Sequence, residues 1–310
     1  MDYDMKLIKD TKEFELYGKS AVTIGKFDGI HKGHQILLQE IIDCKKQGMQ
    51  AVVFTFDMPL ASFFGNAVQK ELTTKEEKRR IFEEMGIDVL IEFPINKETA
   101  AISPEDFIEK ILHEKLHAAR IAAGPDLSFG YKGAGNSELL KKLGKRYDYT
   151  VFISDKLCVQ GREISSSLIR EDVELGNVEA VFDLTGRYYS FTGEVTHGKK
   201  LGRTLNMPTI NLIPAANKLL PPCGVYYSRI RIDDELFFGI TNIGMNPTVS
   251  DENHLRVETF IYDFNRELYG MEVTVEVMAF KRPEMKFDSL EALVAQLEED
   301  KADGRDFFSI

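Results

Sequence analysis

The hydrophobic pattern of this 310-residue chain changes near Asp183. Before that residue, short apolar runs rich in β-branched side chains alternate with segments of helical periodicity. After it, almost every apolar segment has the length and composition of a strand. Alternating strands and helices are typical of a parallel sheet covered by helices, whereas strand upon strand indicates an antiparallel β domain. The sequence therefore predicts two domains of different class, residues 1–183 and residues 184–310.

The first domain is predicted to be a parallel sheet with helices between its strands. Strands are expected at Ala21–Ile24, Ala51–Phe56, Asp88–Phe93, Ala119–Ala123 and Tyr149–Ile153. Helices are expected after Gly33, over Thr74–Met85, from Ser103 to about Leu116, and from Ser137. Ligands of such sheets bind beyond the carboxyl ends of the strands, so we expect the site there.

The second domain is predicted to be a small antiparallel barrel closed by one C-terminal helix. Its strands are expected at Ser190–Thr196, Gly224–Ile232, Leu236–Ile243, Arg256–Asp263 and Met271–Phe280, with a further extended segment at Thr209–Asn211. The helix is expected from Ser289 to about Asp303. Leu184–Arg187 is expected to link the two domains.

Composition restricts the class of protein. The net charge of −11 disfavours a general binder of nucleic acids or anionic membranes. No segment approaches the roughly 20 apolar residues of a membrane span. Cys44, Cys158 and Cys223 are scattered, which suggests a reducing compartment without disulfides. Because the N-terminus carries Asp2 and Asp4 and no apolar run, we expect no signal peptide and a cytoplasmic protein.

The stretch Gly25–Gln35 places two histidines, three glycines and an aspartate between a strand and a helix. Its glycines permit a tight turn, and the following helix directs free N–H groups and its positive dipole end toward that turn. An anion such as a phosphate is expected to bind there, with His31 and His34 as additional donors. The alternatives are a structural histidine pair or a zinc site, although no further metal ligand lies at a supporting spacing nearby.

A second candidate phosphate site opens another helix. Ser165, Ser166 and Ser167 stand where helix N-caps stand, and Arg170 follows one turn later. Hydroxyls and free N–H groups hold phosphate oxygens, and an arginine can clamp them with two hydrogen bonds. The alternative is an ordinary serine-rich helix cap.

A third segment lies in the predicted barrel. Lys199, Lys200 and Arg203 form a basic patch in an acidic protein, which suits the phosphates of ATP. Thr209 and Asn211 alternate along an extended segment and therefore project to one face. Their oxygens suit Mg²⁺, which prefers oxygen ligands. The alternative is a polar loop with a proline turn.

Glu258 is a candidate general base. It lies in a predicted strand, on the opposite face from Val257 and on the same face as Phe260. A carboxylate beside an apolar neighbour is suited to accept a proton. The alternative is a cross-strand ion-pair partner, for example of an arginine.

These segments resemble the prokaryotic family of bifunctional riboflavin kinase/FMN adenylyltransferases (FAD synthetases). Residues 25–34 are similar to its Gly-x-Phe-Asp-Gly-x-His-x-Gly-His motif, and residues 164–170 to Ile-Ser-Ser-Thr-x-Ile-Arg. Residues 124–130 resemble Gly-Glu-Asp-Phe-x-Phe-Gly, residues 202–211 Gly-Arg…Pro-Thr-x-Asn, and residues 257–264 Val-Glu-Thr-His-x-x-Asp-Phe. The sequence departs from these family segments at Leu127, Ser167, Ile210 and Phe260. A further departure is Met58 in residues 54–59, where the family segment usually ends in Pro-His-Pro.

The resemblance implies a Rossmann-type nucleotidylyltransferase domain that makes FAD from FMN and ATP, followed by a six-stranded barrel that phosphorylates riboflavin with ATP and Mg²⁺. It implies catalytic roles for His31, His34, Arg170 and Glu258. It assigns ATP binding in the first domain to Gly25, Phe27, Asp28, Gly29, Arg162, Ser165, Ser166 and Ser167, and flavin binding to Asp126 and Phe129. In the second domain it assigns ATP binding to Gly202, Arg203, Thr204 and Pro208, and the metal to Thr209 and Asn211.

The expected partners are therefore riboflavin, FMN and ATP, with no nucleic acid and no membrane, in a monomer or weak homo-oligomer. Two alternatives stay open. In the first alternative, only one of the two activities is retained. In the second, the chain is a non-catalytic flavin or nucleotide sensor on the same scaffold.

Overall fold

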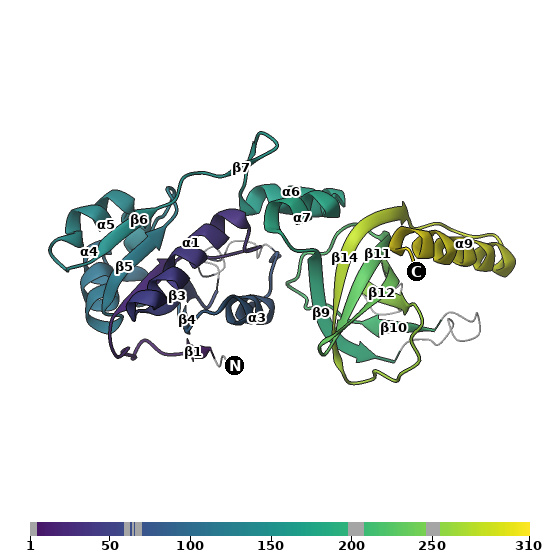
Figure 1. The fold of residues 1–310 in the computed structure, drawn as a ribbon, viewed down its shortest axis with the longest axis horizontal. Coiled ribbons are helices and arrows are strands. Elements are labelled where there is room, and N and C mark those ends of the chain that lie inside the picture. Colours follow the sequence, from purple (N-terminus) through teal and green to yellow (C-terminus); the bar gives the residue numbers. More distant parts are fainter. Residues whose placement is uncertain (1–4, 59–62, 64, 66–69, 198–207, 246–254) are drawn as a thin grey trace. The chain divides into compact units, whose positions relative to one another are not determined.

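The computed structural model describes residues 5–58, 63, 65, 70–197, 208–245 and 255–310 (Figure 1). The chain forms two compact units, residues 1–166 and residues 167–310. The predicted domain boundary at residue 183 stays a prediction.

The first unit contains a six-stranded, fully parallel sheet, as the alternating pattern predicted. Its strand order is β1-β4-β3-β2-β5-β6. The bounds are β1 Lys6–Lys9, β2 Ser20–Ile24, β3 Gln50–Phe56, β4 Val89–Phe93, β5 Ala118–Ala123 and β6 Thr150–Ile153. The strand β1 was not predicted, because it is a short edge strand in which lysines flank two apolar residues.

Helices cover both faces of this sheet. They are α1 Lys32–Asp43, the short helix η1 Cys44–Gln47, α3 Lys75–Met85, α4 Pro104–Asp106 continuing as the π-helix η3 Phe107–Lys115, and α5 Ser137–Gly144. Two further short turns are η2 Thr99–Ala101 and η4 Tyr131–Gly133. Alternate residues of each strand pack against α1 and α3 on one face and against η3 and α5 on the other. The central strands β2, β3 and β4 are therefore mostly apolar and buried, as expected of a sheet covered on both sides.

The predicted helix starts are confirmed by their caps. Thr74 accepts a hydrogen bond from the Glu77 backbone N–H, and the Glu77 carboxylate accepts one in return, which is a capping box. Ser103 caps the next helix with Pro104 in its first turn. Gly86 ends α3 with a φ of 87°, a left-handed conformation that favours glycine.

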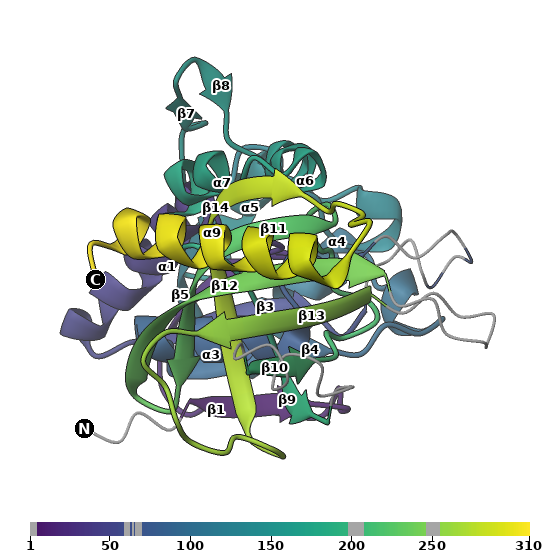
Figure 2. The same ribbon diagram turned by 90° about the vertical axis from the view of Figure 1, so that its right-hand side faces the viewer.

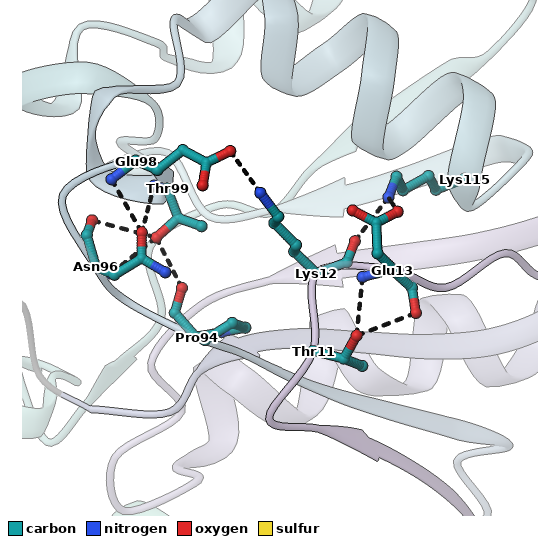
Figure 3. Close-up of polar contacts among 8 residues, drawn as sticks. All are labelled: Thr11, Lys12, Glu13, Pro94, Asn96, Glu98, Thr99 and Lys115. Carbon is teal, nitrogen blue, oxygen red and sulfur yellow. Dashed lines mark hydrogen bonds and ion pairs between the residues drawn. The ribbon is translucent and has the colours of Figure 1, made fainter.

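Polar contacts tie the connection between β1 and β2 to two neighbouring segments of the same unit (Figure 3). Lys115 donates to the backbone oxygen of Lys12 at 2.6 Å and pairs with Glu13 at 3.2 Å. Lys12 also pairs with Glu98. These ties join the connection to the end of η3 and to the turn after β4. They hold it where Leu16 is buried in the core.

The second unit contains a closed antiparallel barrel with the order β10-β13-β12-β11-β14-β9, which confirms the predicted six strands. The bounds are β9 Tyr189–Thr196, β10 Thr209–Leu212, β11 Gly224–Ile232, β12 Glu235–Met245, β13 Leu255–Ile261 and β14 Glu272–Pro283. The C-terminal helix α9, Leu290–Phe308, lies across the outside of the barrel (Figure 2). It runs beyond the expected end near Asp303, because Gly304 is a buried packing position against the Tyr262 hydroxyl and does not terminate the helix.

Two helices precede the barrel, α6 Ser166–Leu175 and α7 Val178–Thr185. The expected linker was wrong in part, since Leu184 and Thr185 form the last turn of α7 and Gly186 caps it. The helix α7 packs against β14 and β9, so its apolar face is used within this unit. A small hairpin, β7 Cys158–Val159 and β8 Arg162–Glu163, was also not predicted, because two-residue strands carry no periodic signal.

Replacing Asp300 by asparagine is expected to destabilise the barrel unit by about 1–3 kcal/mol. Asp300 on α9 is buried and accepts hydrogen bonds from Arg282 on β14, Nε to Oδ1 at 3.0 Å and Nε to Oδ2 at 3.1 Å. An amide in this place loses the charge and turns a donor toward the guanidinium. Calorimetry measures the effect. Asp303→Asn, at the more exposed Lys281 ion pair, is the control with an expected loss below about 1 kcal/mol. Equal losses in both variants would contradict the prediction.

Candidate active sites

The turn that joins β2 to α1 lies at the carboxyl end of a central strand. Three of its residues have a positive φ, Phe27 at 50°, Gly29 at 79° and Ile30 at 38°. Such angles are unfavourable for Phe and Ile and persist only where packing enforces them. Both side chains are buried in the core beneath α1, which supplies that packing. The turn is therefore held in one shape, with His31 at its end.

His31 is the N-cap of α1. Its Nδ1 accepts a hydrogen bond from the His34 backbone N–H at 3.2 Å. The ring is only 8% exposed, and this burial lowers the pKa of His31 to about 4 against a backbone hydrogen bond that raises it. At neutral pH the ring is thus uncharged, and because Nδ1 is an acceptor, its proton resides on Nε2. A side chain at Gly33 would press on this ring, with a Cβ only 3.1 Å from Nδ1.

His34 stacks on His31. The ring centroids are 3.7 Å apart with 15° between the planes, and Phe27 lies 5.1 Å from His34 on an inclined plane. Burial and the neighbouring His31 lower the pKa of His34 well below its usual value. Among the described residues, its shielded Nδ1 has no hydrogen-bond partner. The pair therefore presents two neutral imidazoles at the N-terminus of a helix.

This geometry favours an anion over a zinc ion. Two parallel stacked rings do not direct nitrogens to one common point, and the Nδ1 of His31 is already occupied. Within the described part of the chain, no group of three or more His, Cys, Asp or Glu side chains could hold a metal ion. Free N–H groups at a helix start and a neutral imidazole N–H suit phosphate oxygens.

The acid stability of the protein should depend on His31. The fold favours the neutral His31 ring. Below the ordinary histidine pKa of 6.5, the unfolded chain therefore binds more protons than the folded protein does. The stabilisation is present above pH 6.5 and is lost as the pH falls through about 4. His31→Asn keeps a good N-cap but does not titrate. We expect its melting temperature to fall less steeply between these pH values than that of the wild type. If the melting temperatures of the two proteins fall in parallel with pH, burial of His31 does not contribute to the loss of stability in acid.

Asp28 stabilises the turn by hydrogen bonds to the segment that precedes α3. Its carboxylate accepts hydrogen bonds from the backbone N–H groups of Leu72 at 2.9 Å and Thr73 at 3.2 Å. The Thr73 hydroxyl in turn accepts the Gly29 N–H at 2.7 Å. Sequence reasoning missed Leu72 and Thr73, because contacts across more than forty residues leave no periodic signal. The predicted residue Gly25 is fixed by its N–H bond to Phe54 at 3.1 Å.

The second phosphate segment meets this turn. The Ser166 hydroxyl donates to the backbone oxygen of Asp28 at 2.8 Å, although 138 residues separate them. Ser165 is half-buried just before it. Ser167 and Arg170 follow on α6, and Arg162 is exposed on the β7–β8 hairpin. The structure thus brings the start of the second segment to the first.

The two predicted flavin residues differ in environment. Asp126 is exposed and pairs with Lys156 at 3.2 Å, and Lys156 also pairs with Glu163 at 2.8 Å. Lys156 was not singled out from the sequence. Phe129 is buried in the core against Phe107, with ring centroids 5.5 Å apart. Of the two, only Asp126 presents its side chain to solvent, and both assignments stay predictions.

The predicted kinase residues meet on adjacent strands of the barrel. Asn211 on β10 lies directly opposite Glu258 on β13, and Asn242 on β12 lies opposite Glu258 on its other side. Val257 and Thr259 are fully buried, so Glu258 and its cross-strand partners occupy the outer face. Thr209 pairs with Phe260 and shares that face with Asn211. The Thr196 hydroxyl donates to the Asn211 backbone oxygen at 3.3 Å.

Arg256 contacts both kinase candidates. Its Nε lies 2.7 Å from the Asn211 side-chain oxygen and 3.0 Å from the Glu258 carboxylate. The alternative considered for Glu258, an ion pair with an arginine, is therefore present, although the arginine is on the same strand. Sequence reasoning missed Arg256, which carried no signal beyond its alternation with Glu258.

The residues predicted to bind ATP in the second domain are only partly among the described residues. Gly202, Arg203 and Thr204 lie outside the described residues, whereas Pro208 is exposed immediately before β10. Met58, which stands where the family has a histidine, is exposed. Across the described residues, no helix is both long and apolar enough to cross a membrane.

Comparisons with known proteins cover both units. A family model described as FAD synthetase matches residues 14–168, and one described as riboflavin kinase matches residues 185–308. A bifunctional riboflavin kinase/FMN adenylyltransferase from Listeria monocytogenes is 36% identical over 93% of this chain and 92% of that protein. One from Escherichia coli is 32% identical over 94% and 93%. A crystal structure described as a macrolide-efflux protein from Streptococcus pneumoniae is similar with a TM-score of 0.85 and 30% identity, covering 97% of this chain and 98% of that one.

Proposed function

Because this chain belongs to the family of bifunctional riboflavin kinase/FMN adenylyltransferases, we propose that each of its two reactions uses one of the residue sets described above. The enzyme acts in FAD biosynthesis. It phosphorylates riboflavin to FMN with ATP, and it transfers an adenylyl group from a second ATP to FMN with release of pyrophosphate.

In the adenylyltransferase step, an FMN phosphate oxygen attacks the α-phosphorus of ATP while the bond to pyrophosphate breaks. His31 donates from Nε2 to an α-phosphate oxygen, and His34 assists as the neighbouring imidazole. Both rings remain neutral at physiological pH, because burial lowers the pKa of each. They therefore stabilise developing charge as hydrogen-bond donors at a helix N-terminus. No covalent enzyme intermediate is needed, and the catalysis consists of positioning and electrostatics.

The surrounding residues are proposed to hold the substrates of this step. Gly25, Phe27, Asp28 and Gly29 shape the turn that receives ATP. Ser165, Ser166, Ser167, Arg162 and Arg170 hold its phosphates, with Arg170 on the leaving pyrophosphate, and Asp126 and Phe129 lie on the flavin side. The bond from Ser166 to the Asp28 backbone supports this assignment, because it joins the two phosphate-binding segments.

In the kinase step, Glu258 is proposed to take the proton from the 5′-hydroxyl of riboflavin as that oxygen attacks the γ-phosphorus of ATP. The bond from the γ-phosphorus to the bridging oxygen breaks, and ADP leaves. Gly202, Arg203, Thr204 and Pro208 bind the ATP. Thr209 and Asn211 would hold Mg²⁺, and their hard oxygen donors fit that ion. The Asn211 side-chain oxygen accepts a hydrogen bond from the Arg256 guanidinium, which supports the assignment of this oxygen as a ligand for a cation. Bound Mg²⁺ would neutralise phosphate charge.

The stacked His31–His34 pair, held neutral at the start of α1, is the observation that carries the adenylyltransferase assignment. The test is to incubate the purified protein with riboflavin, ATP and Mg²⁺ and to follow FMN and FAD by chromatography. We expect FMN to appear first and FAD after it. Accumulation of FMN alone would mean that the protein has only the kinase activity. No product at all would favour a non-catalytic sensor.

The remaining assignments are also proposals. We propose a cytoplasmic enzyme whose partners are riboflavin, FMN and ATP, without nucleic acid or membrane, and a domain boundary near residue 183. The acidic net charge of −11 supports the exclusion of nucleic acids. Gel filtration with light scattering tests the expected monomer or weak homo-oligomer.

A further inference from the structure

The outer face of the barrel carries a row of polar side chains that crosses three strands. Asn211, Glu258 and Asn242 lie side by side in register on β10, β13 and β12. Arg256 precedes Glu258 by two residues and projects to the same face. Its side chain is 21% exposed and that of Glu258 is 36% exposed. The cation is thus partly shielded from water.

The guanidinium of Arg256 stands at the proposed metal ligand. One nitrogen, Nε, is within 3.0 Å of oxygens from both Asn211 and Glu258. A divalent cation on the Asn211 oxygen would stand a few ångströms from this positive charge. Two cations at that separation repel each other, and partial burial weakens the screening of this repulsion. The two cations therefore compete for the same oxygens.

The fold offers the arginine a second carboxylate. Arg256 lies opposite Gly244 on β12, and the Glu284 carboxylate reaches over the bare backbone of that glycine. Only a residue without a side chain leaves this approach open. A guanidinium displaced from Asn211 would find another anionic partner nearby, so its movement need not leave it unpaired.

We propose that Arg256 is a positioning residue of the kinase site that competes with Mg²⁺ for Asn211. It holds Asn211 and Glu258 together and leaves Asn211 when the metal binds. This proposal rests on the proposed function of Asn211 and Glu258 in riboflavin phosphorylation. Its direct consequence is that loss of the positive charge at residue 256 strengthens metal binding, whereas loss of a merely structural contact weakens it or has no effect.

The test compares Arg256→Gln and Arg256→Lys with the wild type in Mn²⁺ titrations followed by electron paramagnetic resonance in the presence of ADP. Asn211→Ala identifies the part of the binding that belongs to the kinase site. We expect Arg256→Gln to lower the Mn²⁺ concentration for half-saturation of that part by about two- to fivefold, the range of a partly exposed charge pair. Arg256→Lys keeps the charge and should stay near the wild type.

Arg229→Gln is the matched control, because Arg229 pairs with Glu276 on the same barrel away from Asn211. It should bind Mn²⁺ as the wild type does. The Mg²⁺ requirement for riboflavin phosphorylation should fall in Arg256→Gln alone, while FAD formation from FMN, which uses the other unit, should be unchanged and calorimetry checks that the barrel is folded. If Arg256→Gln and Arg229→Gln need the same Mn²⁺ concentration for half-saturation, the proposed role of Arg256 is wrong and the assignment of the metal site stands. If Asn211→Ala binds Mn²⁺ and makes FMN as the wild type does, both proposals fail.

Discussion

Replacing His31 or His34 by alanine is expected to lower FAD formation from FMN by about two to three orders of magnitude, the effect of removing one preorganised donor from a charge-stabilising site. Riboflavin phosphorylation should be unchanged, because the residues proposed for it lie on the barrel. The two imidazoles stack at 3.7 Å and share one buried environment. Losing either ring exposes the other to water, so the double variant should be little worse than each single one.

The controls separate chemistry from folding. His31→Ala also removes an N-cap, which costs about 0.5–2 kcal/mol of stability. His31→Asn keeps the cap and lacks the ring N–H, so it should remain folded and still make little FAD. His113→Ala, at an exposed histidine of the same unit, should make FAD normally. Normal FAD synthesis by His31→Asn and His34→Ala would remove the pair from the mechanism.

Glu258→Gln is expected to show the reverse pattern. Riboflavin phosphorylation should fall by about two to four orders of magnitude, the usual contribution of a general base. FAD formation from supplied FMN should persist. Glutamine has nearly the same size as glutamate and can still accept a hydrogen bond from Arg256, so the strand pairing with Asn211 should survive. The rates of FMN and FAD formation, measured separately by chromatography, give both quantities.

Glu276→Gln is the comparison for this variant. Glu276 lies on the same barrel and also pairs with an arginine, but it faces Arg229 and Arg231. Its replacement should affect stability more than turnover. Should Glu258→Gln phosphorylate riboflavin as fast as Glu276→Gln, the pairing with Arg256 would be the whole role of Glu258.

Much of the fold could be predicted because it follows from local patterns. Apolar runs located the central strands, and Thr74, Ser103 and Ser289 marked helix starts by caps that the structure confirms. The elements that were missed lack such signals. The edge strand β1 has only four residues, and β7 and β8 have two each. The helix α7 was not predicted, and its last two residues were expected to lie in the linker.

The sites were only partly predictable for the same reason. The spacing of His31 and His34 indicated an anion site, but not that one ring caps the helix or that the rings stack. Asp28 was expected to bind ATP, which stays a prediction, but not to tie the turn to Leu72 and Thr73 through its carboxylate. Arg256 was overlooked beside Glu258. Each of these roles depends on a contact with a residue that the pattern along the chain does not specify.

The tie between the turn and α3 has a consequence for changes in chain length. Thr73 and Thr74 are consecutive, yet the hydroxyl of the first holds the Gly29 N–H and that of the second caps α3. Surface connections generally accept insertions and deletions. Here, adding or removing one residue next to this pair would shift both threonines along the chain. The hydrogen bond to the Gly29 N–H and the cap of α3 could then not both form. Related sequences should therefore vary in length before residue 72 and not between residue 72 and the start of α3.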